Sequence, residues 1–508
     1  MEQSNNKQTK RPPYGILSVL MIGAFISFLN NTLLNVALPS IMVEFEVGPS
    51  IVQWLTTGFM LVNGIMIPTT AFLIQKYSVR KLFLTAMGLF TVGTIVAGFS
   101  DFFSVLLLAR MLQAAGSAIM MPLLMNVMLV SFPIEKRGTA MGIFGLILMF
   151  APAIGPTLSG LIIEHYQWRA LFYFIAPIAV AVFLFGVFML KDKKEKVDIK
   201  LDVFSLLLSS VGFGGLLYGF SAAGNAGWGS PQVYLTIIIG AISLFLFVKR
   251  QAKLKEPMLN FDVYKHPMFT LSSVISSVVT MSLFSGMLLL PIFVQTVRGF
   301  SPLEAGLMLM PGAILNAFMS PVTGRLFDKF GGRALVVTGL VLTTVPTYYL
   351  SILTFETSFT YITVIHTIRM LGMSMVLMPV QTNGLNQLPP RYYPHGTAVN
   401  NTLQQVSGAI GTALLITVMS NRQAVYTTQF TESAMKEMTG TPTEAALAEL
   451  QQQIVMKAML EGINDAFLVA TFISGIALVL AFFMKRAKQA ADPLDDKQTE
   501  KKIEPEMV

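Results

Sequence analysis

Two arginines that interrupt long apolar stretches are the residues of this chain best placed to do chemistry. Arg110 lies within Leu107-Leu-Ala-Arg-Met-Leu-Gln113, and Arg369 lies in a second such stretch. A charged side chain inside an apolar helix must face protein or water and have a partner, because its insertion into a bilayer costs about 2.5–3.5 kcal/mol. The simplest role for Arg110 is structural, with its guanidinium bonded to backbone carbonyls.

Asn30 and Asn31 are expected to face Arg110. The helices that carry them run in opposite directions, and each residue lies roughly 7–9 residues from the same end of its helix. At a rise of about 1.5 Å per residue this is a common depth on the order of 12 Å. The sequence therefore predicts contact between Arg110 and amides of the first helix.

His366 precedes Arg369 by three residues, so both side chains lie on one face of a helix. Histidine can relay protons near neutral pH. A neighbouring cation, however, disfavours its charged form. A proton relay and a neutral hydrogen-bonding role for His366 are both open at this point.

The composition indicates a protein built for lipid. Of 508 residues, 54% are hydrophobic and only 12% are charged, whereas soluble domains carry about 25% charged residues. The chain has no cysteine, which excludes disulfides, thiol catalysis and thiolate zinc sites. The four histidines are scattered without metal-ligand spacing, and no phosphate loop or nucleophile motif occurs. We expect no enzyme activity, no metal and no cofactor.

Apolar runs long enough to cross a bilayer recur along the chain, and only helices or closed barrels satisfy their backbone there. We predict an all-α integral membrane protein with fourteen transmembrane helices. Basic residues gather in alternate loops, which places both termini in the cytoplasm and accounts for the net charge of +8 without a nucleic-acid partner. The predicted spans are 15–38, 51–74, 82–99, 103–131, 138–163, 170–190, 202–222, 232–248, 268–297, 303–325, 334–354, 358–387, 397–420 and 464–484.

The chain contains an internal repeat. Pro68 to Arg80 aligns with Pro321 to Arg333 without a gap, and four further motifs recur in the same order at an offset of 253–259 residues. Two parallel six-helix bundles plus an inserted helix pair explain this pattern, and they imply a shared central site between bundles that rock. The expected parts are a tail 1–14, bundles 15–190 and 266–486, the inserted pair 191–265 and a disordered tail 487–508.

The second bundle includes the external segment 421–463, for which we expect short amphipathic helices on the outer face, with disorder as the alternative. Pro442-Thr443-Glu444 has the composition of a helix start.

With these features the chain resembles the major facilitator superfamily, and in particular its fourteen-helix drug:H+ antiporter branch of the lincomycin-resistance type. The resemblance rests on Ala151-Pro-Ala-Ile-Gly-Pro-Thr-Leu-Ser-Gly160, on Leu33-Leu-Asn-Val-Ala-Leu-Pro39, on the Arg110 motif and on the loop Gly324 to Arg333. It implies a proton-driven exporter of hydrophobic or amphiphilic drugs in a bacterial cytoplasmic membrane. The expected partners are small amphiphilic molecules, protons and membrane lipids, and a monomer is expected. The alternatives are a lipid or glycolipid transporter with weak or no proton coupling and a membrane sensor that transports nothing.

The resemblance also implies a role in proton transfer for Arg110, yet the proton carrier usual in the family is missing. Related antiporters have an acid just before the threonine of the first helix, where this chain has Asn30-Asn31-Thr32. Three explanations are open: Glu164 or His366 carries the proton, coupling has been lost, or an acid was replaced by an amide. The predicted coupling set is Arg110, Asn30, Asn31, Glu164, His366 and Arg369.

Two further motifs are expected to seal the protein at its two ends. In the helix-5 motif, small residues permit close helix packing and prolines bend the helix; the predicted gating residues are Pro152, Gly155, Pro156 and Gly160. In the loop after the tenth helix, Asp328 can accept from a helix N-terminus and from guanidinium groups, with Arg325 and Arg333 beside it. The first-half counterpart has Gln75 and Arg80, which predicts a weaker latch there.

A cavity for varied amphiphiles should combine apolar walls with scattered amides. Amides inside the predicted spans are the candidates, and the scarcity of acids favours neutral or zwitterionic ligands over organic dications. The predicted cavity residues are Asn30, Asn31, Asn126, Asn316, Gln381, Asn401, Gln404 and Gln405.

Overall fold

The computed structural model describes residues 14–52, 54–191, 201–254, 256–437 and 444–486, and this part of the chain is helical without a strand. Each of the fourteen predicted ranges is helical over most of its length. Eleven helices have the length and hydropathy of a membrane span, and α3 adds a twelfth if its two parts, bent by 50° at Pro68, form one span. The all-α membrane class is confirmed, and the count of fourteen spans stays a prediction.

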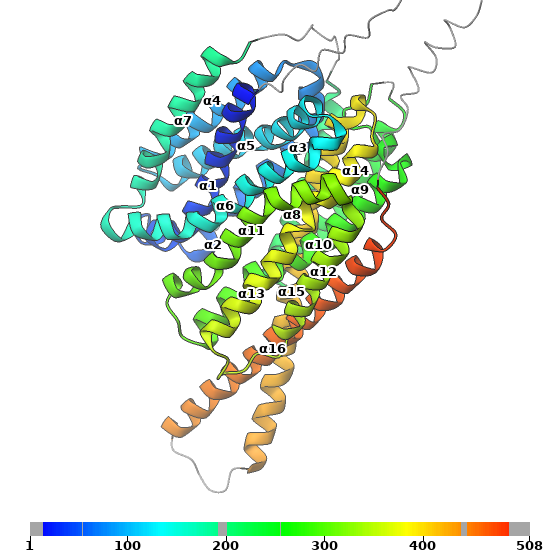
Figure 1. Cartoon of the computed structure of the whole chain (residues 1–508). Coiled ribbons are helices and arrows are strands. Elements are labelled where there is room, and N and C mark those ends of the chain that lie inside the picture. Colours follow the sequence, from blue (N-terminus) through cyan, green and yellow to red (C-terminus); the bar gives the residue numbers. More distant parts are fainter. Residues whose placement is uncertain (1–13, 53, 192–200, 255, 438–443, 487–508) are drawn as a thin grey trace, which may run out of the picture.

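The first half of the chain forms a bundle in which α1 packs on α6 and α7, α4 packs on α5 and α7, and α3 packs on α5 (Figure 1). Short helices, α2 and the 3-10 turn η1, connect longer ones. The elements are α1 (Tyr14–Glu44), α2 (Pro49–Val52), α3 (Trp54–Lys76), α4 (Val79–Gly98), α5 (Phe103–Ser131), η1 (Ile134–Lys136), α6 (Arg137–His165) and α7 (Arg169–Met189).

The second half repeats these pairings, since α10 packs on α15 and α16, α12 on α13 and α16, and α11 on α13. The order is the one that the sequence repeat predicts. The elements are η2 (Phe261–Lys265), α10 (Pro267–Ile292), the π-helical turn η3 (Phe293–Val297), α11 (Pro302–Phe330), α12 (Gly332–Tyr349), α13 (Phe359–Ser374), α14 (Leu377–Gln387), η4 (Pro390–Tyr392), α15 (Tyr393–Glu437) and α16 (Glu444–Ala481).

The predicted twelfth span is two helices, α13 and α14, with a break at Met375 and Val376. Pro379 explains the break, because a proline ring inside a helix clashes with the carbonyl four residues earlier, here that of Met375.

The inserted pair, α8 (Val203–Ala226) and α9 (Pro231–Gln251), packs together and lies against α3 of the first half and α15 of the second. Asp202 begins α8 and accepts hydrogen bonds from Arg250 at 2.6 Å and 3.0 Å. These bonds lower the pKa of Asp202 to about 2. The pair therefore stays joined at one end of the molecule while it covers the junction between the halves.

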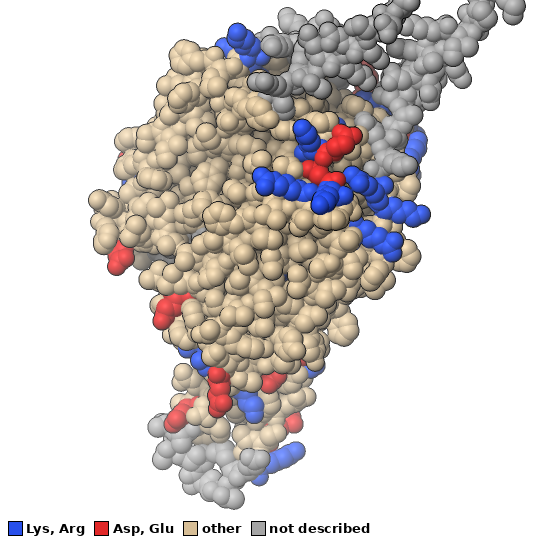
Figure 2. Space-filling model, viewed as in Figure 1, with Lys and Arg blue, Asp and Glu red and all other residues tan. Residues whose placement is uncertain are grey.

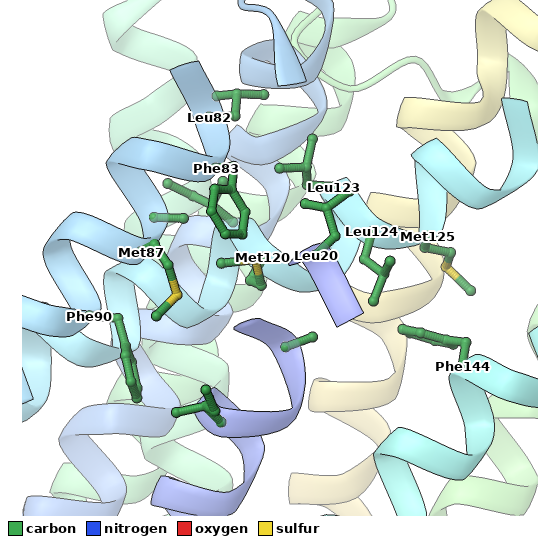
Figure 3. Close-up of a cluster of buried hydrophobic side chains, with 14 of the residues drawn as sticks. Leu20, Leu82, Phe83, Met87, Phe90, Met120, Leu123, Leu124, Met125 and Phe144 are labelled. Atoms are coloured by element: carbon green, nitrogen blue, oxygen red, sulfur yellow. The ribbon is translucent and has the colours of Figure 1, made fainter. Parts of the chain in front are cut away.

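An apolar cluster between α1, α4 and α5 holds the first half together. Phe83, Met87 and Phe90 of α4 face Met120 and Leu123 of α5, with Leu20 of α1 beside Leu123 (Figure 3). All six side chains are fully buried. Because lipid tails are as apolar as these side chains, close packing rather than the hydrophobic effect stabilises such a contact inside a membrane.

Charged side chains lie at the two ends of the molecule, with a broad uncharged band between them on the face shown in Figure 2. At one end α3, α5 and α11 finish and α6 begins, and we call it the basic end. The opposite end carries the projecting hairpin of α15 and α16 (Figure 1).

That hairpin corrects one expectation. Residues 421–437 and 444–463 are not short separate helices but the continuations of α15 and α16, which extend beyond the body of the bundle. The start of α16 at Glu444 agrees with the predicted helix start. The predicted tails and the basic loop 192–200 lie outside the described residues.

The two halves meet closely along α6 and α11, where glycines remove side chains from the contact. A Cβ built on Gly324 would lie 2.2 Å from the carbonyl oxygen of Gly138, and one on Gly142 would lie 2.5 Å from that of Ser320. Both obstacles are backbone atoms, so neither can rotate away. Close approach at the basic end therefore requires these glycines.

Replacing Gly324 by alanine is expected to weaken this contact, because overpacking typically costs about 1–3 kcal/mol. We expect the melting temperature of the purified protein to fall by several degrees. Gly306→Ala in the same helix is the matched control, since nothing lies within 4 Å of a Cβ at that position. Equal melting temperatures for the two variants would contradict the close approach of α6 and α11.

Candidate functional site

A cavity of about 370 Å³ lies between the two halves. The first half lines it with residues of α1, α3, α5 and α6, and the second half lines it with residues of α10, α11, α13, α14 and α15. Most of its wall is apolar, with phenylalanine and methionine prominent. These are Phe28, Phe144, Phe284, Met121, Met149, Met287, Met370 and Met378.

The polar part of the wall is amide and basic. No aspartate or glutamate occurs among the described residues that line the cavity, and none is buried anywhere in the described chain. The polar lining residues that can donate or accept are Asn63, Ser117, Thr280, His366, Arg369, Gln381, Asn401, Gln404 and Gln405.

Four of the eight predicted amides therefore lie on the wall: Gln381, Asn401, Gln404 and Gln405. The other four, Asn30, Asn31, Asn126 and Asn316, are not among its lining residues. Asn63 of α3 was not predicted. It lies in the sequence Leu-Val-Asn63-Gly, where a single amide in an apolar run was the only signal.

Arg110 is fully buried in the first half and is held by amides. Its Nη1 donates to Gln113 at 2.9 Å, and its Nη2 donates to Asn31 at 3.1 Å. The guanidinium carbon lies 4.5 Å from the centre of the Phe59 ring. The predicted contact with the first helix therefore exists, and Arg110 is tied to α1, α3 and its own helix.

Gln113 is the centre of this network, and the sequence analysis did not single it out. It accepts from Arg110 and from Asn30 (3.2 Å), and its own amide donates to Thr94 of α4 at 2.8 Å. Its position one helical turn after Arg110 was the available signal. The network joins α1, α4 and α5 with side chains that cannot titrate near neutral pH.

Arg369 is the counterpart of Arg110 and is also fully buried. Its Nε donates to Thr347 at 3.0 Å, and its Nη2 donates to the Ser282 carbonyl at 2.8 Å and to Ser285 at 3.0 Å. Unlike Arg110, Arg369 lines the cavity, as does His366. The predicted coupling residues thus separate into an amide network in the first half and a basic pair on the cavity wall in the second.

Glu164 belongs to neither group. It is exposed, near the end of α6 that lies away from the basic end. No other carboxylate takes the place of the missing acid in the described core. Among the described lining residues, the ionisable side chains are therefore those of Arg369 and His366.

Asp328 joins the halves at the basic end. Its Oδ1 accepts from the backbone N–H of Gly138 at 2.7 Å, and its Oδ2 accepts from the N–H and the hydroxyl of Thr139 at 2.8 Å and 2.6 Å. These donors belong to the first turn of α6, where unsatisfied N–H groups and the helix dipole favour a negative charge. The carboxylate of the second half thus caps a helix of the first.

The basic residues beside Asp328 do not join this contact. Arg325 and Arg333 are exposed, and the hydrogen bonds to the Asp328 carboxylate come from α6. In the first half, Gln75 donates to Ala71 of its own helix, and Arg80 donates to the Val187 carbonyl of α7.

Arg137 makes a second contact between the halves, although its place among the basic loop residues predicted only a topological role. Its Nη1 donates to Asn386 of α14 at 3.3 Å, and its guanidinium lies 4.9 Å from the centre of the Tyr393 ring of α15. Arg137 directly precedes Gly138, so both contacts close the same end.

The helix-5 motif packs within the first half. Ser159 donates to the Leu33 carbonyl at 2.7 Å, and a Cβ on Gly155 would lie 2.1 Å from the Thr32 hydroxyl oxygen of α1. Gly160 has open space around it. The side chains of Pro152 and Pro156 lie outside those that the structure describes. The motif therefore acts here as a seam between α6 and α1, and its gating role stays a prediction.

Within the described residues no cluster of three or more His, Asp or Glu side chains could hold a metal ion.

Comparison with known proteins gives a consistent result along nearly the whole chain. The family model described as Major Facilitator Superfamily matches residues 20–412. YhcA of Bacillus subtilis, described as an uncharacterized MFS-type transporter, is 46% identical over 98% of this chain and 97% of its own length. The lincomycin resistance protein LmrB of Listeria monocytogenes is 42% identical over 96% of this chain and 100% of its own.

More distant proteins also match this chain over nearly its whole length. The multidrug export protein EmrB of Escherichia coli is 26% identical over 94% of this chain and 97% of its own. Among solved structures, the human organic anion transporter MFSD10 matches 93% of this chain and 100% of its own with a TM-score of 0.66, at 14% identity. At that identity the match concerns the fold alone, and it agrees with two bundles around a central cavity.

Proposed function

Because this chain belongs to the major facilitator superfamily, we propose that it is a secondary active efflux transporter, which exports small hydrophobic or amphiphilic molecules by alternating access. The observation that carries the proposal is the cavity between the two halves. Its volume and its mixture of apolar walls and amides suit a drug-sized ligand. Rocking of the halves about it would expose it to one side of the membrane at a time.

The direction of transport is supported by the relatives' names. Proteins described as lincomycin resistance and multidrug export proteins share almost the full length of this chain. All of the named sequence relatives are bacterial, which supports the cytoplasmic membrane as the location. The distribution of basic residues supports cytoplasmic termini and makes the basic end the cytoplasmic side.

On this assignment the structure is closed toward the cytoplasm. The contacts of Asp328 and Arg137 and the glycine contact of α6 with α11 all lie at the basic end. For a substrate to enter from the cytoplasm, these contacts must break. We therefore assign Asp328 and Arg137 as latches that hold the outward-directed state.

Proton influx is the proposed driving force, and His366 is the proposed proton-binding group on the cavity wall. The Arg110 network keeps a positive charge in the first half, where Arg110 donates to the amide of Asn31 and not to a titratable acid. The proposed coupling therefore places the proton in the second half.

The test is transport by the purified protein in liposomes, with radiolabelled lincomycin and a fluorescent amphiphile as separate cargoes. An imposed pH gradient is expected to stimulate accumulation of at least one of them, and collapsing the gradient should abolish the stimulation. Gradient-independent movement of lipid headgroups, with no cargo transport, would instead identify a lipid transporter and overturn the proposal.

Asn31→Asp is expected to alter the pH dependence of transport. The substitution has almost the same shape, and it places a titratable oxygen where Arg110 now donates to an amide. We expect a pH profile of gradient-driven transport with an additional inflection, measured between pH 5 and 9. Asn31→Ala is the control, since it removes the contact without adding a titratable group. Superimposable profiles for the Asp variant and the native protein would sink the idea of a vacated proton site.

A further inference from the structure

The guanidinium of Arg369, in the cavity wall, has one donor without a partner. The Nη1 of Arg369 is buried and makes no hydrogen bond, whereas Nε and Nη2 of the same guanidinium are bonded to Thr347, Ser282 and Ser285. Arg369 itself is 0% exposed. A buried cationic donor without a partner is unfavourable, because a charge leaves water at a high cost unless it is paired.

The unpartnered atom lies beside the cavity. Nη1 occupies the space next to Gly286, where an added Cβ would lie 2.1 Å from it, and Gly286 and Arg369 both line the cavity. The neighbouring Nδ1 of His366, 4% exposed as a residue, is also without a partner. His366 and Arg369 both lie on α13, three residues apart, and both residues line the cavity.

The surroundings offer nothing to neutralise Arg369. The described residues of the cavity wall include no carboxylate, and the groups that hold Arg369 on α10 and α12 are hydroxyls and a backbone carbonyl. Amides of α14 and α15, among them Gln381 and Gln404, complete the polar side. The cavity thus carries one fixed positive charge that the protein leaves unpaired.

The comparison with Arg110 makes the arrangement specific. Both Nη atoms of Arg110 donate to side-chain amides, and Arg110 is not among the lining residues. The two arginines occupy equivalent places in the sequence repeat, and each keeps one unbonded buried nitrogen, Nε in Arg110 and Nη1 in Arg369, but only Arg369 lines the cavity.

We propose that the cavity binds amphiphiles that carry an acidic group, and that Arg369 Nη1 holds that group by a charge-assisted hydrogen bond, with His366 Nδ1 as a second donor. This inference rests on the proposed function for the existence of a cargo and adds its chemical class. A carboxylate or phosphonate satisfies the guanidinium, while its apolar body contacts the phenylalanine and methionine walls. A cationic analogue meets Arg369 as a like charge and is excluded.

The test is equilibrium binding to the full-length protein in nanodiscs, without a proton gradient. Three fluorescent probes of nearly equal size differ in charge: dansylglycine is an acid, dansylglycinamide is neutral, and the dansyl derivative of ethylenediamine is a cation. Empty nanodiscs correct for partition into lipid. We expect the native protein to bind the acid at least ten-fold more tightly than the amide, and the cation more weakly than both.

Arg369→Gln is expected to reduce the preference for acid over amide to less than two-fold, and Arg369→Lys to retain a preference of at least three-fold. Arg110→Gln is the matched control, because it removes an equally buried arginine that does not line the cavity, and it should keep the ten-fold preference.

Equal affinity of the native protein for acid and amide would overturn the inference, whether or not any variant folds. So would a preserved ten-fold preference in Arg369→Gln, or its loss in Arg110→Gln. The proposed function fails separately: a protein that binds the acid probe yet moves no cargo in liposomes refutes transport alone, and one that exports neutral drugs without acid preference refutes this inference alone.

Discussion

Asp328→Asn is expected to shift the protein toward the state that is open at the basic end by at least ten-fold. The carboxylate receives three hydrogen bonds from Gly138 and Thr139 in the first turn of α6, two of them from backbone N–H groups. A hydrogen bond to a charged group is worth about 1.5–3 kcal/mol, and loss of about 1.4 kcal/mol corresponds to a factor of ten in the equilibrium. The asparagine amide can also accept through only one of its two atoms, because its NH2 group is a donor like the helix N–H groups that it would face.

The measurement is the distance between spin labels on cysteines introduced at Glu135 and Arg333, which are exposed at the basic end of the two halves. The chain has no native cysteine, so labelling is confined to these sites. The control is Arg325→Gln, since Arg325 is exposed and is not bonded to Asp328. If the Asn variant and this control have the same distance distribution, Asp328 is not a latch.

Arg110→Ala is expected to reduce gradient-driven transport by at least twenty-fold while the protein still reaches the membrane. In the described part of the first half Arg110 is the only charged side chain that is fully buried within a span. Its removal leaves the acceptor oxygens of Asn31 and Gln113 without their charged donor. We expect loss of the electrostatic link through which proton movement acts on this half.

Transport in liposomes under an imposed pH gradient measures this loss, and binding of a cargo without a gradient serves as its control. Arg110→Lys is expected to recover part of the activity, because it keeps the charge but not the two Nη contacts. Transport at the native rate by Arg110→Ala would show that the network is only structural.

Much of the architecture could be predicted because it depends on one-dimensional features. The lengths of the apolar runs predicted where the helices lie. The alternation of basic residues predicted which loops share one side of the membrane. The equal depth of Arg110 and Asn31 along antiparallel helices was sufficient to predict the contact between them. The negative charge and position of Asp328 were sufficient to predict that it accepts hydrogen bonds from a helix N-terminus, although not that its neighbouring arginines are absent from the contact.

The direction in which a span residue faces could not be predicted. In a lipid-embedded helix the outward and inward faces are both apolar, so periodicity does not separate Asn316, off the cavity wall, from Gln404, on it. Arg137 was assigned to topology because position alone does not distinguish a solvated charge from a bridging one. The length of the α15 and α16 hairpin was underestimated for another reason. The two helices extend beyond the bundle together, so each stays packed against the other.

The central claim is that the two halves rock about one cavity. The most direct measurement is a pair of distances between labels on introduced cysteines, with no other substitution, one between positions Glu135 and Arg333 at the basic end and one between Asp101 and Glu356 at the opposite end, all of them exposed. Between the proton-rich and proton-poor conditions, and on addition of cargo, we predict that one distance lengthens as the other shortens. Two distances that stay constant, or that lengthen together, would contradict alternating access in this protein.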